Sequence, residues 1–162
     1  LRLLLVFWQG CDAQRFLVEA LEYELLERHK LEPLREWYGV AIHQLPDAYK
    51  RVVLVPDYIT DATVAQSMFT WQVTLLRGGK ADEIVECASA EEAHILRLFV
   101  ELGKRHIEIP LDAPIIAELV PKVERFRADL DAAIAAVCSV IPAGAIRDAT
   151  AQALRARMVE GA

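Results

Sequence analysis

Residues 84–112, IVECASAEEAHILRLFVELGKRHIEIPLD, constrain the fold more than any other stretch of the chain. Ser89 and Glu92 have the spacing of a capping box, which satisfies free backbone amides at the start of a helix. Apolar residues follow at helical spacing as far as Gly103, a residue suited to the left-handed conformation that ends helices. Residues 106–109 are short and β-branched, which is typical of a strand. The segment therefore predicts a β-α-β unit whose two strands lie parallel in one sheet.

The segments before this unit extend the alternation of strands and helices. Residues 2–8 and 51–55 are predicted as buried strands, and residues 2–8 are apolar on both faces, as at the centre of a parallel sheet. Residues 34–38 are the weakest strand, which either precedes a single helical turn or forms a hairpin with the next strand. Helices are expected over residues 12–28 and 61–77. The pattern predicts an α/β fold, a three-layer flavodoxin-like sandwich around a parallel five-stranded sheet.

After residue 112 the pattern changes, which divides the chain into an α/β domain (1–112) and C-terminal helices (113–162). A long helix carries apolar residues at alternating spacings of three and four, typical of a coiled-coil seam. We call these residues the seam: Ile116, Leu119, Val123, Phe126, Leu130, Ala133, Val137 and Val140. Residues 142–144 break the helix, and a final amphipathic helix follows over residues 145–158. The seam is buried either in a two-fold homodimer or by the final helix folding back as an intramolecular hairpin.

Composition excludes several classes of function. The net charge of −6 and the absence of Lys or Arg runs argue against direct nucleic-acid binding. No apolar run approaches the roughly 20 residues that cross a bilayer. Cys11, Cys87 and Cys138 are odd in number and widely spaced, so no disulfide framework or metal site is expected, and a reducing cytoplasm is the default.

The order of elements over residues 1–125 resembles the receiver domain of two-component response regulators. LRLLLVFWQ is similar to the opening strand of that family, and LGKRHIEIPLDAPIIAELVPKVERF is similar to its ending: glycine, short strand, proline, acidic residue and helix. The resemblance implies the receiver-like sheet and a role in signal transduction.

The residues that carry out phosphoryl transfer in receivers are missing at the matching positions. A working receiver needs an acidic pair to hold Mg²⁺, a phosphorylatable Asp, a hydroxyl residue and a Lys. Phe7 and Trp8 stand for the acidic pair, Cys87 for the hydroxyl and Ile109 for the Lys, and Asp57 alone could be the acceptor. The resemblance therefore implies a pseudo-receiver, a non-enzymatic module without metal or cofactor.

Such a module acts by binding proteins, and two surfaces are candidates. The first is the face that receivers use for partners, for which a solvated polar surface is an equal alternative; the second is the seam, through which the chain would form a homodimer. The candidate residues are Arg97, Glu101, His106 and Glu108 on the first surface and Leu119, Val123, Phe126, Leu130 and Val137 on the second.

A ligand- or nucleotide-binding flavodoxin-like domain, possibly enzymatic, is the alternative. Asp12 with Phe16, and KRVVLVPDYI as a middle strand, are similar to TIR domains. However, QSMFTWQVTLL has no Glu near Trp71, where NAD-cleaving members of that family carry one.

Overall fold

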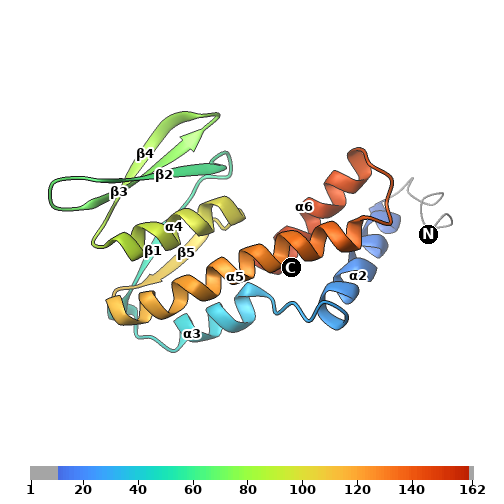
Figure 1. Cartoon of the computed structure of the whole chain (residues 1–162), viewed down its shortest axis with the longest axis horizontal. Coiled ribbons are helices and arrows are strands. Elements are labelled where there is room, and N and C mark those ends of the chain that lie inside the picture. The colour runs from blue at the N-terminus through green and yellow to red at the C-terminus, as the bar shows by residue number, and fades with distance from the viewer. Residues whose placement is uncertain (1–10, 161–162) are drawn as a thin grey trace. The chain divides into compact units, whose positions relative to one another are not determined.

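The computed structural model describes residues 11–160, which form two compact units (Figure 1). The described part of the first unit comprises residues 11–34 and 126–160, and the second unit comprises residues 35–125. Helix α5 (Ala113–Cys138) is continuous and contributes its first half to the second unit and its second half to the first. The strand expected over residues 2–8 lies outside the described residues. No helix among the described residues has the length and apolarity that crossing a membrane requires.

The first unit is built from three helices: α2 (Cys11–Glu27), the second half of α5, and α6 (Ala145–Val159). Leu17, Leu21 and Leu25 are buried along one face of α2, at the spacing of a helix with one apolar side. Ion pairs join α6 to both other helices: Arg157 to Glu22 at 2.5 Å, and Arg155 to Asp131. The helices predicted over residues 12–28 and 145–158 are confirmed within one residue at each end.

The seam is buried within the single chain. In the second unit the seam residues Ile116, Leu119 and Val123 are at most 6% exposed; those of the first unit are also buried, apart from the half-exposed Val140. Helix α6 folds back toward α5, and the Arg147 Nε donates to the carbonyl of Ile141 at 2.6 Å. Within the first unit this arrangement resembles the intramolecular hairpin that was the alternative to a dimer.

The second unit contains all the described strands and one long helix between two of them. Its elements are η1 (a π-helix, Arg35–Gly39), α3 (Val40–His43), η2 (a 3₁₀ turn, Asp47–Tyr49), β1 (Lys50–Leu54), β2 (Asp61–Gln66), β3 (Trp71–Arg77), β4 (Lys80–Cys87), α4 (Ala90–Leu102), β5 (His106–Pro110) and the first half of α5. Strands β2, β3 and β4 form an antiparallel meander in that order, and α4 packs across it. Strands β1 and β5 form a separate antiparallel pair.

The predicted parallel five-stranded sheet is therefore wrong. Gly78 and Gly79 connect β3 to β4, and both have positive φ (57° and 81°), as a two-residue type I′ turn requires. A turn this short joins only antiparallel strands. Strand β5 pairs with β1 rather than with β4, so the expected parallel β-α-β unit is absent. The flavodoxin-like, receiver-like and TIR-like architectures all depend on the parallel sheet and are overturned with it.

The helix expected over residues 61–77 is also wrong, because this stretch forms β2 and β3. Ala62 and Val64 alternate with exposed residues on β2, and the buried Val73 and Leu75 face the same side of the sheet on β3. This period of two places the apolar residues under α4, whereas helical spacing would scatter them.

The strand expected over residues 34–38 is helical instead. Leu34, Tyr38 and Ile42 are all buried and lie four residues apart, which puts them on one face of the η1–α3 segment. The helical turn that one alternative placed near residues 41–45 overlaps α3.

Helix α4 and its ends agree with the sequence prediction. The Ser89 Oγ accepts from the Glu92 amide at 3.1 Å, and Gly103 adopts the left-handed conformation with φ 88°. The strand that follows is confirmed as β5, although its partner differs.

Candidate protein-interaction surface

Of the residues matched to a receiver pocket, Asp57 lies apart from Ile109. Phe7 and Trp8 lie outside the described residues; the other three are Asp57, Cys87 and Ile109. The Asp57 side chain is fully exposed, after the end of β1, with an Oδ1 4.0 Å from the Arg105 Nε. Ile109 is buried and pairs with Arg51, near the start of β1. Because β1 and β5 are antiparallel, Asp57 and Ile109 lie toward opposite ends of the strand pair.

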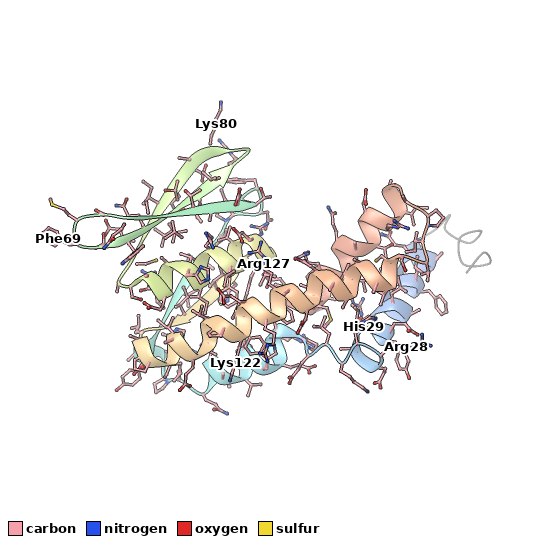
Figure 2. All side chains as sticks on the ribbon, in the orientation of Figure 1. Arg28, His29, Phe69, Lys80, Lys122 and Arg127 are labelled. Atoms are coloured by element: carbon pink, nitrogen blue, oxygen red, sulfur yellow. The ribbon has the colours of Figure 1, made fainter. Side chains whose placement is uncertain are left out.

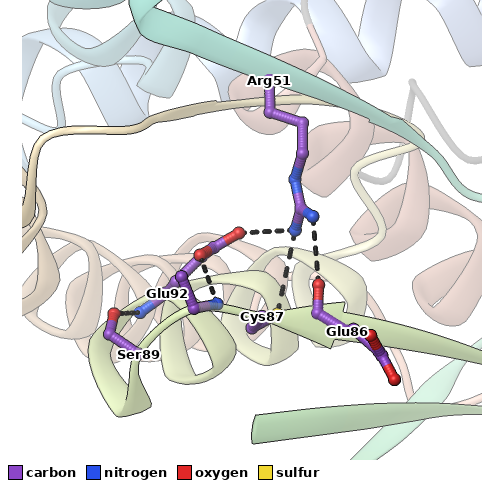
Figure 3. Close-up of polar contacts among 6 residues, drawn as sticks. Arg51, Glu86, Cys87, Ser89 and Glu92 are labelled. Atoms are coloured by element: carbon purple, nitrogen blue, oxygen red, sulfur yellow. Dashed lines mark hydrogen bonds and ion pairs between the residues drawn. The ribbon is translucent and has the colours of Figure 1, made fainter. Parts of the chain in front are cut away.

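A polar cluster links β1 to the junction of β4 and α4 (Figure 3). The Arg51 guanidinium lies 2.5 Å from the Glu92 Oε1, donates to the Glu86 carbonyl at 3.0 Å, and contacts the Cys87 Sγ at 3.8 Å. The second oxygen of Glu92 accepts from the Ala88 amide at 2.9 Å. Both oxygens of this buried carboxylate are therefore used within the fold.

Cys87 has the environment of an unreactive thiol. Burial raises its pKa, the nearby Glu92 carboxylate raises it further, and the Arg51 guanidinium opposes these effects only in part. Since the thiolate is the nucleophile, a raised pKa keeps Cys87 in its inert protonated form at neutral pH. The cluster is suited to holding strands together rather than to transforming a substrate.

The four polar residues of the first candidate surface lie on two elements. On α4, His94 Nε2 is 2.6 Å from the Glu124 Oε1 of α5, and Arg97 bridges His94 Nδ1 (3.4 Å) and Glu101 (3.8 Å). On β5, His106 is exposed, and Glu108 lies 3.9 Å from the Lys50 Nζ. The residues of the second candidate surface, Leu119, Val123, Phe126, Leu130 and Val137, are all buried.

The most exposed large apolar side chains of the described residues lie where no functional residue was predicted. Met68 and Phe69 are 87% and 91% exposed at the turn between β2 and β3. The Ser67 amide donates to the Thr70 carbonyl at 2.8 Å and closes this turn, which we call the hairpin tip (67–70). Figure 2 shows Phe69 at the far end of the hairpin, projecting from the ribbon. Turns usually carry Gly, Pro, Asn, Asp or Ser. Because Met68 and Phe69 occupy the central positions, no turn was predicted here and the exposed pair was missed.

Strand β2 beside the hairpin tip has a free edge. Because Ser67 bonds toward β3, alternate residues 61, 63 and 65 also bond toward β3, and the backbone groups of Ala62, Val64 and Gln66 point outward. The Ala62 amide is held by the Asp61 Oδ1 at 2.8 Å. Within residues 11–160, no strand pairs with this side of β2.

Comparison of the chain with protein-family models, with curated proteins and with solved structures finds no match. The candidate surface therefore stands on its own geometry. Among the described residues, no three His, Cys, Asp or Glu side chains gather as metal ligands would.

Proposed function

We propose that this chain is a non-catalytic protein-interaction module of the cytoplasm, which binds a protein partner through the hairpin tip and the free edge of β2. The exposure of Met68 and Phe69 carries the proposal. Aromatic residues and Met are enriched in protein interfaces, and burying one such side chain contributes about 2 kcal/mol. Their turn is closed by a backbone hydrogen bond, so its backbone loses little conformational freedom when a partner covers the two side chains.

The state of the polar clusters supports the non-catalytic part of the proposal. Arg51 and Glu92 form an ion pair and bond neighbouring backbone groups, and the raised pKa of Cys87 disfavours a nucleophile. The signalling role implied by the receiver resemblance depended on a parallel sheet, so it is not carried into the proposal.

Position-specific photocrosslinking in the native host tests the proposal. A photoreactive benzoylphenylalanine replaces Phe69 in one strain and, as the matched control, Lys80 at the other hairpin turn of the same sheet (Figure 2). We expect a discrete protein adduct from position 69, identified by mass spectrometry, and none from position 80. The second change Met68→Asp should reduce the adduct at position 69 by about tenfold, because a charge opposes burial of the tip. Equal adducts from both positions, or no adduct at all, would contradict the proposal.

A further inference from the structure

The two outer strands of the three-stranded sheet, β2 and β4, differ in how their outward backbone groups are covered. The outward backbone groups of β4 lie beside acidic side chains, and near its end they are covered: the Glu86 carbonyl accepts from Arg51, and the Ala88 amide donates to Glu92. Among the described residues, the outward groups of β2 have no such cover beyond the bond from Ala62 to Asp61. Proteins usually protect an edge strand with Lys, Pro or a bulge, and residues 62–66 of β2 have none of these.

We propose that β2 pairs with β2 of a second copy of the chain, antiparallel and about a two-fold axis centred on Val64. This register places Ala62 opposite position 66 of the second copy and Thr63 opposite its position 65. The inference rests on the proposed function, since it names the partner that the tip and edge bind. The two meanders then form one continuous six-stranded sheet.

The hydrogen-bonding pattern of β2 is symmetric about Val64. Residues 62, 64 and 66 point outward, so each Val64 amide faces the Val64 carbonyl of the other copy, and each Gln66 amide faces the other Ala62 carbonyl. These four bonds use groups that the described strands leave unpaired. A fifth and sixth bond, from the two Ala62 amides, form where the Asp61 side chains release them.

Charge favours β2 over β4 as the self-pairing strand. Asp61 is the only charged residue of β2, and the two-fold axis places it opposite Ser67 of the second copy, at the far end from the other Asp61. A β4–β4 pair would instead gather Asp82, Glu83 and Glu86 from both copies at one edge, where like charges repel.

The same register gives the hairpin tip a partner. Strand β2 ends at Gln66, so Met68 and Phe69 of one copy extend beyond position 61 of the other, alongside residues 58–60. Tyr58 is half-exposed there. Each end of the interface therefore gathers three exposed apolar side chains, Met68 and Phe69 of one copy and Tyr58 of the other, which explains why an apolar tip adjoins an open edge.

Disulfide trapping tests the register in purified protein carrying Cys11→Ser. Thr63 and Ala65 are exposed, and in the proposed pair they form a non-hydrogen-bonded couple with Cα atoms about 4.5 Å apart, within the roughly 4.4–6.8 Å that a disulfide spans. A mixture of Thr63→Cys and Ala65→Cys chains should crosslink under mild oxidation. Either variant alone is the matched control, because its like pairs lie diagonally at about 7–8 Å. Crosslinking of the single variants as fast as the mixture would overturn the register.

A proline series tests the edge itself. Val64→Pro removes an amide that points outward, so we expect the far-ultraviolet circular dichroism to persist while the dimer Kd from sedimentation rises at least about tenfold. Ala65→Pro removes an amide bonded to β3 and should unfold the hairpin, which shows that the direction of the amide decides the effect. A wild-type chain that stays monomeric at all concentrations overturns this inference. If it does so while position 69 still crosslinks to a different protein in the host, the proposed function survives; if position 69 gives no adduct either, both fail.

Discussion

The edges of β2 and β4 belong to one three-stranded sheet, yet they differ in every property that governs strand association. The edge of β4 carries Asp82, Glu83 and Glu86, and the Arg51 guanidinium occupies the Glu86 carbonyl. The edge of β2 is uncharged from Ala62 to Gln66. An edge strand is a template for another chain unless charge or cover prevents pairing. The difference indicates that the fold closes one side of the sheet and leaves the other available.

The second sheet shows the same closure on β5. Residues 107 and 109 bond toward β1, so Glu108 and Pro110 face the outer side. The Tyr38 hydroxyl donates to the Glu108 carbonyl at 2.8 Å, and Pro110 has no amide to offer. Among the described residues, the outer edges of β4 and β5 are thus closed by side chains from other elements, whereas the outer edge of β2 has only the local bond from Ala62 to Asp61.

The largest expected effect on stability comes from removing Arg51, which covers the edge of β4. Arg51→Ala leaves the buried Glu92 carboxylate without its cation, and we expect a loss of about 3 kcal/mol in the free energy of unfolding, the scale for breaking a buried ion pair. Urea denaturation followed by circular dichroism measures it.

The control for this change is Arg15→Ala, which breaks an exposed ion pair with Glu19 at 3.0 Å within one helix. Its cost should stay within about 0.5 kcal/mol. Equal losses in the two variants would show that the Arg51–Glu92 pair contributes no more than a surface contact.

Local elements could be predicted from the sequence, whereas the pairing of the strands could not. The α4 unit was predictable because its signals are local: Ser89, Glu92 and Gly103 each act on the nearest backbone groups. The partners of the strands were not, because pairing joins residues as distant as Arg51 and Ile109. Apolar strands at 51–55 and 106–109 are compatible with either direction, and the alternation of strand and helix favoured the parallel one.

The hairpin from β2 to β3 was not predicted, for a different reason. Residues 61–77 contain Thr, Val and Trp at strand spacing, but the turn at Met68 and Phe69 lacks the Gly, Asn or Asp that normally marks a hairpin. The absence of Gly, Asn or Asp from the two central positions of the turn concealed both the strands and the exposed apolar pair. The candidate surface was therefore missed together with the fold around it, and the apolar residues that did suggest an interface, those of the seam, are buried apart from Val140.

The second effect in size concerns the turn that orders the meander. Gly79→Ala places a side chain at φ 81°, and we expect a loss of about 1.5 kcal/mol from left-handed strain, measured by urea denaturation. Beyond the residue and its two chain neighbours no atom lies within 4 Å of the added Cβ, so clashes with the rest of the fold contribute nothing. Gly79→Asn should cost less, because Asn tolerates this conformation. If Ala and Asn cost the same, backbone strain is not the cause.

Removing the Tyr38 hydroxyl, which covers the outer edge of β5, has a smaller effect on stability, and this effect depends on pH. Tyr38→Phe removes the hydrogen bond to the Glu108 carbonyl, and the free energy of unfolding should fall by about 1 kcal/mol. Burial, and secondarily Glu108, raise the pKa of Tyr38, so the folded chain holds this proton more tightly than the unfolded chain. Its contribution is complete below the ordinary tyrosine pKa and is lost as the pH rises above it.

Denaturation at neutral and strongly alkaline pH separates the two effects of Tyr38. The wild type should lose more stability on alkalinisation than Tyr38→Phe, whereas the exposed control Tyr49→Phe should follow the wild type. Parallel pH profiles for wild type and Tyr38→Phe would refute this origin of alkaline sensitivity.

The smallest effect lies on the open edge and tests whether β2 is partly guarded. Asp61→Ala frees the outward Ala62 amide, which costs an exposed local hydrogen bond of less than about 0.5 kcal/mol in the monomer. The freed amide becomes available to the second copy, so the dimer should tighten by about threefold in sedimentation, equivalent to roughly 0.65 kcal/mol. Asp61→Asn keeps a side-chain acceptor and should match the wild type. A weaker dimer in Asp61→Ala would mean that Asp61 itself contacts the partner, and it would shift the register away from Val64. The direction of this small change therefore distinguishes an edge whose outward backbone groups are all available from one whose Ala62 amide is held by Asp61.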